Sequence, residues 1–88
     1  MLNQAILVGR VFAVEDGLLT IKIPRDSENK EEADLISARM QDNVNKSVQE
    51  YCKKGDIVGI KGNLRNDGNG IYLNINKITF LTSSAKED

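Results

Sequence analysis

The sequence predicts a small barrel of five β-strands with one α-helix closing its open end. Apolar residues recur with a period of two in four short segments, which is the pattern of half-buried strands, and a fifth segment, at residues 2–14, is a longer run of mostly apolar residues. A single segment, placed between the third and fourth of these five in chain order, has the spacing of an amphipathic helix. With 88 residues the chain can bury one modest core, so we expect one domain over residues 1–82 and a short polar tail at 83–88.

The first two strands are expected at residues 2–14 and 18–23, with a tight hairpin turn around Asp16-Gly17. The interior of the first strand is apolar on both faces, which is typical of a strand that is buried or that also forms an interface. Gly9 within it indicates a bend or a bulge of the kind that barrels need at their corners. Pro24 ends the second strand, and the acidic loop at 25–32 is expected to be solvated and mobile.

The third strand is expected at residues 33–41 and the helix at 44–52. The apolar face of the helix is formed by four residues at i, i+4, i+7 and i+8, namely Val44, Val48, Tyr51 and Cys52. Asp42 or Asn43 can cap its first turn. The helix dipole favours the cations Lys53 and Lys54 at the C-terminal end of the helix. Gly55 is expected to end the helix because glycine readily adopts the left-handed conformation.

The last two strands are expected at residues 57–65 and 71–81, joined by a compact turn at 66–70. In the fourth strand Val58, Ile60, Gly62 and Leu64 share one side, and Lys61 and Arg65 lie on the other. The order of three strands, one helix and two strands is that of an oligonucleotide/oligosaccharide-binding (OB) barrel, in which the helix plugs the bottom.

Composition excludes several kinds of function. The chain has no histidine, which argues against zinc sites and histidine-based catalysis, and its one cysteine, Cys52, allows no internal disulfide. The acidic residues cluster in a loop, so we expect no enzyme, no metal and no cofactor. No signal peptide or long apolar run is present, which favours a cytoplasmic protein. The net charge of −1 means that a case for nucleic acid has to depend on how charge is distributed.

Polar residues on one side of the second, third and fourth predicted strands include at least one cation from each of these three strands. They are Thr20, Lys22, Ser37, Arg39, Gln41, Lys61 and Arg65. Cations spread along a sheet face are suited to holding a phosphate chain without reading bases. The alternative is that they only keep a half-exposed sheet soluble.

Aromatic residues that could stack on bases are few. Tyr72 is the best candidate because it shares a side with Asn74 and borders the turn at 66–70. Tyr51 is expected to be structural on the core face of the helix, and Phe80 is expected in the core or an interface. Phe12 fits either role.

Several segments resemble the bacterial and phage single-stranded DNA-binding proteins. They are Leu-Val-Gly-Arg at 7–10, Ala-Asp-Leu-Ile at 33–36, Lys-Lys-Gly-Asp at 53–56, Lys-Gly-Asn-Leu-Arg at 61–65 and Ile-Thr-Phe-Leu at 78–81. The resemblance implies an OB fold, self-association through the first strands as a homotetramer or a dimer, and sequence-tolerant binding of single-stranded DNA. Matching positions suggest Arg10, Arg39, Lys61 and Arg65 as contacts to the DNA backbone. Leu35 stands where the family usually has an aromatic residue.

Two hypotheses follow. The first is a sequence-nonspecific single-stranded DNA-binding protein of replication, recombination or repair, whose binding residues are Arg10, Lys22, Leu35, Arg39, Lys61, Arg65 and Tyr72. The second is an OB-fold protein-interaction module, similar to a primosomal replication protein, in which DNA binding is weak or lost. The scarcity of aromatics and the near-neutral charge favour the second, and the matching basic positions favour the first.

Overall fold

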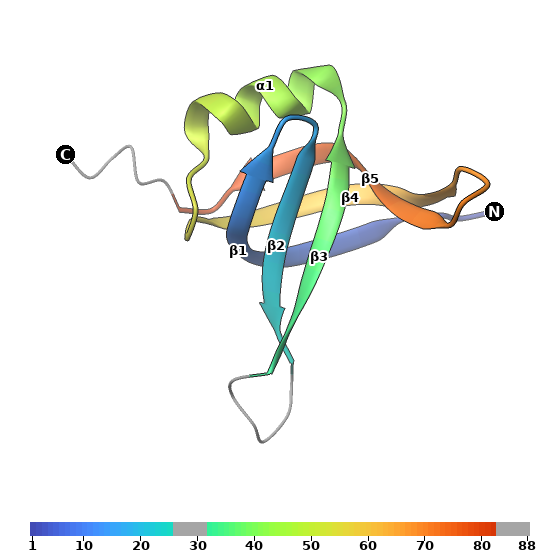
Figure 1. The fold of residues 1–88 in the computed structure, drawn as a ribbon, viewed down its shortest axis with the longest axis horizontal. Helices are drawn as coiled ribbons and strands as arrows, with labels where there is room; N and C mark the ends of the chain where they lie inside the picture. Colours follow the sequence, from blue (N-terminus) through green and yellow to red (C-terminus); the bar gives the residue numbers. More distant parts are fainter. Residues whose placement is uncertain (26–31, 83–88) are drawn as a thin grey trace.

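The computed structural model describes residues 1–25 and 32–82 and shows a closed five-stranded barrel (Figure 1). The elements in chain order are β1 (Ala5–Glu15), β2 (Leu18–Pro24), β3 (Ala33–Met40), α1 (Asp42–Tyr51), β4 (Ile57–Asn66) and β5 (Ile71–Phe80). Around the barrel the strands follow one another as β1, β2, β3, β5 and β4. This confirms the predicted OB fold. The interior of the predicted acidic loop, 26–31, and the predicted tail, 83–88, lie outside the described residues.

The long first strand serves two sides of the barrel. Its first half, from Ala5 to Arg10, pairs with β4, and its second half pairs with β2 from Arg10 onward. Gly9 lies at the changeover, where a Cβ atom would stand 2.8 Å from the backbone oxygen of Lys22. The predicted bend is therefore present and needs a glycine for close approach, whereas the bulge itself lies three residues later, at Phe12.

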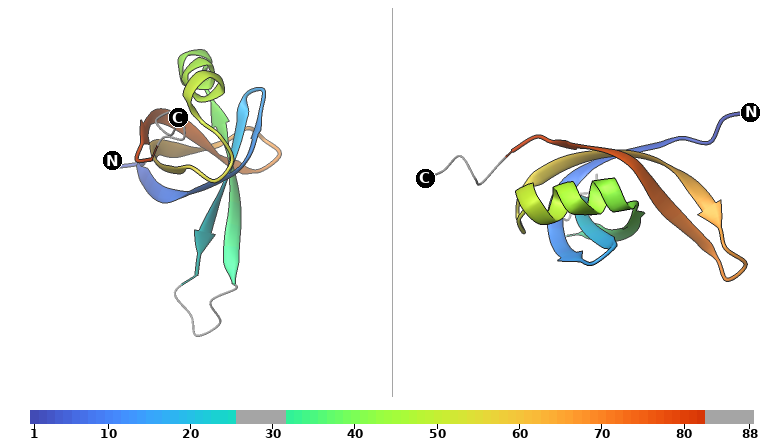
Figure 2. Two further views of the ribbon diagram at one scale, coloured as in Figure 1. Left: turned by 90° about the vertical axis from the view of Figure 1, so that its left-hand side faces the viewer. Right: turned by 90° about the horizontal axis from the view of Figure 1, so that it is seen from above.

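The core is formed by inward residues of all five strands and by one face of the helix. Its buried members are Val11, Leu19, Ile21, Ala38, Met40, Val44, Val48, Cys52, Val58, Ile60, Leu73 and Ile75. The helix lies across one end of the barrel (Figure 2) and contributes Val44 and Val48 to this core. Since the helix is ten residues long, none of the described residues form a helix able to cross a membrane.

The start of the helix differs from the prediction. Asp42 is the first helical residue, and the N-cap is Gln41, whose side chain makes no capping hydrogen bond. Gln41 therefore ends the strand instead of lying on the face of β3. The Oδ1 atom of Asn43 accepts a hydrogen bond from the next backbone N–H, that of Val44, so it does not cap the helix either.

The end of the helix also differs. The chain leaves the helix at Cys52, which is extended (φ −117°), so Lys53 and Lys54 lie beyond the last turn. The reason is a buried carboxylate: Asp56, 6% exposed, accepts a hydrogen bond of 3.0 Å from the backbone N–H of Lys53. Gly55 does have a positive φ of 98°, but it shapes this connecting turn and does not stop the helix.

Two apolar side chains are less buried than their pattern suggests. Tyr51 is 54% exposed, and the prediction of a core position is wrong. Val44, Val48 and Cys52 already fill the barrel opening, so the Tyr51 ring lies outside it with its centroid 6.2 Å from that of Phe80. Leu64 is 50% exposed because the β4–β5 hairpin runs past the end of the barrel (Figure 1).

Candidate nucleic-acid interface

Three predicted binding residues form a row across the outer face of β1, β2 and β3. Lys22 pairs with Arg10 on one side and with Leu35 on the other. Side chains directly opposite each other in antiparallel strands share a face, so the three lie side by side. Leu35 is 53% exposed, and an Nη1–H of Arg10 donates a 3.0 Å hydrogen bond to the carbonyl of Gly55, which fixes the guanidinium at the edge of the row.

The same face continues along β2 and β3 toward the other end of these strands. The hydroxyl groups of Thr20 and Ser37 are 2.7 Å apart and hydrogen-bonded, and Leu18 then pairs with Arg39. No outward position of the two strands, as the structure describes them, carries an acid. Between Lys22 and Arg39 the outward positions of β2 and β3 therefore carry cations and hydroxyl groups, with Leu35 beside Lys22 and Leu18 beside Arg39.

A second group of predicted residues meets where β3, β5 and β4 lie side by side. The guanidinium carbon of Arg39 lies 3.7 Å from the centroid of the Tyr72 ring, which is stacking distance. Tyr72 pairs directly with Arg65 of β4. The parallel pairing of β3 with β5, with Arg39 opposite Asn74, brings these strands together. No local sequence pattern predicts this parallel pairing of β3 with β5.

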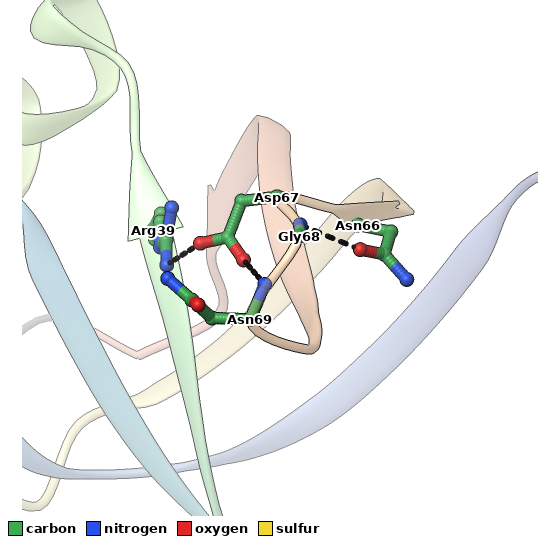
Figure 3. Close-up of polar contacts among 5 residues, drawn as sticks. All are labelled: Arg39, Asn66, Asp67, Gly68 and Asn69. Carbon is green, nitrogen blue, oxygen red and sulfur yellow. Dashed lines mark hydrogen bonds and ion pairs between the residues drawn. The ribbon is translucent and has the colours of Figure 1, made fainter.

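The β4–β5 turn adds an acid, Asp67, that the sequence analysis did not include in the candidate site. The Oδ2 atom of Asp67 lies 2.9 Å from the Nη2 atom of Arg39, and the Oδ1 atom of Asp67 accepts a 2.9 Å hydrogen bond from the backbone N–H of Asn69 (Figure 3). The hydrogen bond from Asn69 and the one from Arg39 lower the pKa of the Asp67 carboxyl. The available signal was the position of Asp67, two residues after Arg65 at the start of a tight turn.

Lys61 does not lie with the other predicted residues. It lies on the outer side of β4, where it pairs with Ile6 of β1 and with Lys77 of β5. β4 is the one strand of the barrel that neighbours neither β2 nor β3. Lys77 is a cation of this side that the sequence reasoning missed. A bulge at Asn76 turns the Lys77 side chain outward. The sequence feature that indicates this bulge is the break in apolar alternation between Ile75 and Ile78.

The remaining aromatics lie outside both groups. Phe12, at the β1 bulge, is 41% exposed, and the Nζ atom of Lys54 lies 5.3 Å from its ring centroid. Phe80 is partly buried and packs against the core, as expected. Tyr72 is therefore the one aromatic that the described structure places among the predicted cations.

Comparison with known proteins identifies the fold. No family model matches the chain, and no curated protein matches its sequence. Solved structures do match. The mitochondrial single-stranded DNA-binding protein Rim1 of S. cerevisiae is 16% identical, with a TM-score of 0.74 over 92% of this chain and 96% of that one. A small single-stranded DNA-binding protein from Mycoplasma pneumoniae is 24% identical, with a TM-score of 0.70 over 92% and 88%.

A third similar structure is the dimeric N-terminal domain of PriB from Thermoanaerobacter tencongensis. It is 21% identical, with a TM-score of 0.68 over 91% of this chain and 97% of that one. At these identities the likeness establishes a shared architecture. The chain is an OB-fold protein, and its fold is the one found in single-stranded DNA-binding proteins.

Proposed function

We propose that this protein binds single-stranded DNA without sequence preference and serves replication, recombination or repair. The observation that carries the proposal is the continuous outer face that joins the Arg10–Lys22–Leu35 row to the group of Arg39, Arg65 and Tyr72. In OB folds the face of strands two and three, with the loops between strands one and two and between strands four and five, binds oligonucleotides. Likeness in fold to proteins described as single-stranded DNA-binding supports the same assignment.

The chemistry of the face suits a flexible strand better than a base-paired one. Arg10, Lys22, Arg39 and Arg65 can each neutralise a phosphate, and such contacts carry no base preference. Tyr72 supplies a ring on which any base can stack, and Leu35 supplies an apolar surface beside the cations. Unstacked bases are available for such contacts in single strands.

Lys61 extends the proposed path onto the next side of the barrel. It is four residues from Arg65 along β4, and a strand rises about 3.3 Å per residue, so the two positions are roughly 13 Å apart along the strand. A DNA strand leaving the face at Arg65 can follow β4 to Lys61 and Lys77. We include Lys61 as a peripheral contact for this reason.

We also propose that the protein self-associates, as a tetramer or a dimer, through the first half of β1. Ile6 is 66% exposed and Val8 is 54% exposed on its outer face, next to the side-chain-free Gly59 of β4. Burial of such neighbouring apolar side chains is what a second copy would provide. Light scattering of the variant Ile6→Glu with Val8→Glu should then give a monomer mass, while Ile71→Glu, on an exposed side chain of β5, should not change the mass.

The alternative function is an OB-fold protein-interaction module with weak or lost DNA binding. The observation that favours it is the ion pair between Arg39 and Asp67, which leaves one cation of the face already neutralised. Likeness in fold to PriB fits either function. In both cases we propose a non-enzymatic, cytoplasmic protein that needs no cofactor.

The test is a fluorescence anisotropy titration of labelled dT oligomers of several lengths at two salt concentrations. Saturable binding that strengthens with length and weakens with salt is the result expected of a DNA-binding face. Absence of binding to every length at low salt would reject the DNA function and leave the interaction module.

A further inference from the structure

The contacts at the β4–β5 turn place a carboxylate against Arg39, one of the cations proposed to hold a DNA phosphate. Asp67 and a phosphodiester both carry one negative charge, and the 2.9 Å distance to Arg39 is that of a charge-assisted hydrogen bond. The guanidinium also covers one face of the Tyr72 ring at 3.7 Å. The residues proposed to hold a phosphate and a base are thus already engaged with each other and with Asp67.

We propose that Asp67 is an internal competitor of DNA at Arg39, and that DNA binds by displacing it. This inference rests on the proposed function, because it concerns the same face. A phosphate that takes the Arg39 N–H groups releases the Asp67 carboxylate. When Arg39 moves off the Tyr72 ring toward the phosphate, the ring face becomes accessible to a base, so one exchange opens both contacts.

The turn holds the carboxylate in place for this role. Oδ1 of Asp67 accepts the backbone N–H of Asn69, and Oδ1 of Asn66 accepts that of Gly68 at 2.7 Å. Gly68, with φ of 93°, permits the tight reversal that brings Asp67 back toward β3. Figure 3 shows the carboxylate between Arg39 and the backbone of the turn, with one oxygen directed to each.

The depressed pKa of Asp67 means that the competitor stays ionised at neutral pH. Both partners remain accessible to solvent, with side-chain exposures of 51% for Arg39 and 32% for Asp67. An exposed ion pair of this kind is weak, so a DNA strand that makes several contacts can break it. The competitor therefore lowers affinity without abolishing binding.

The test compares dT binding by the wild type and by Asp67→Asn. The amide keeps an Oδ1 acceptor for the Asn69 N–H, so the turn is retained, but it presents no charge to Arg39. We expect Asp67→Asn to bind roughly two- to fivefold more tightly, which is the range that loss of an exposed ion pair allows. Asp67→Ser, whose hydroxyl can also accept from the turn, should give the same gain if the amide variant folds poorly.

Two further proteins separate displacement from a general charge effect. Glu50→Gln removes one acid from the exposed side of α1 and should leave affinity unchanged. In an Arg39→Ala background, Asp67→Asn should give no gain, because there is no guanidinium to release. A gain that persists without Arg39, or no gain in the otherwise wild-type chain, would overturn the inference while leaving the DNA function standing. If neither the wild type nor Asp67→Asn binds dT, the proposed function itself fails, and the inference fails with it.

Discussion

Replacing Lys22 by alanine should reduce the salt dependence of DNA binding by about one phosphate contact. Five cations are proposed to meet the backbone, and each neutralised phosphate contributes about −0.7 to the slope of log affinity against log salt on single strands. The expected slope is about −3.5 for the wild type and about −2.8 for Lys22→Ala. Lys22 is the exposed centre of the row, with Arg10 on one side and Leu35 on the other, so its removal interrupts the proposed path.

The assay is anisotropy of labelled dT between 50 and 200 mM salt. With these slopes, affinity should fall about a hundredfold for the wild type and about fiftyfold for Lys22→Ala over that range. Lys46→Ala is the matched control, because it removes the same side chain from the exposed side of α1. An unchanged slope in Lys22→Ala, or an equal reduction in Lys46→Ala, would refute the assignment of phosphate contact to this row.

Three other predictions address stacking, packing and pH. Tyr72→Leu should weaken dT binding about fivefold or more with an unchanged salt slope, while Tyr72→Phe keeps the affinity; an altered slope would contradict a stacking role. Gly62→Ala should destabilise the fold by about 3 kcal/mol in urea unfolding, because its Cβ would stand 2.0 Å from the backbone oxygen of Asn74, whereas Gly59→Ala, with nothing nearer than 3.8 Å, should be nearly neutral. Burial raises the pKa of the Cys52 thiol to about 11, so as the pH rises the unfolded chain loses the thiol proton before the folded chain does. Between pH 9 and 11 the free energy of unfolding of the wild type should therefore fall by about 2 kcal/mol relative to that of Cys52→Ala, which has no thiol to titrate.

The strands and the helix were predictable because their signals are local. Alternation over β2, β3 and β4 and the spacing of Val44 and Val48 depend only on near neighbours in the chain. The end of the helix was not predictable, since it is set by the buried Asp56 carboxylate bonding to the Lys53 N–H. Tyr51 fits the helical period, but the barrel end has no room left for its ring, and helical periodicity does not indicate how much room a core has.

The candidate site was predictable strand by strand and not between strands. Alternation places Lys22 and Arg39 on the outside of β2 and β3, which the structure confirms. The grouping of Arg39 with Tyr72 depends on the parallel pairing of β3 with β5, and the separation of Lys61 depends on which strands are neighbours around the barrel. Both are consequences of topology.

The distance between the two groups determines how affinity should depend on DNA length. A chain of net charge −1 has little long-range attraction for DNA, so binding has to come from contacts made at the face. Leu35 and Arg39 are four residues apart on β3, roughly 13 Å, so a very short oligomer can reach one group and a longer one both. Once one group is engaged, the other meets the strand at high effective concentration. Affinity should therefore rise steeply at the length that first spans both groups and gently beyond it, and a smooth rise with length alone would mean that the two groups do not act on one strand.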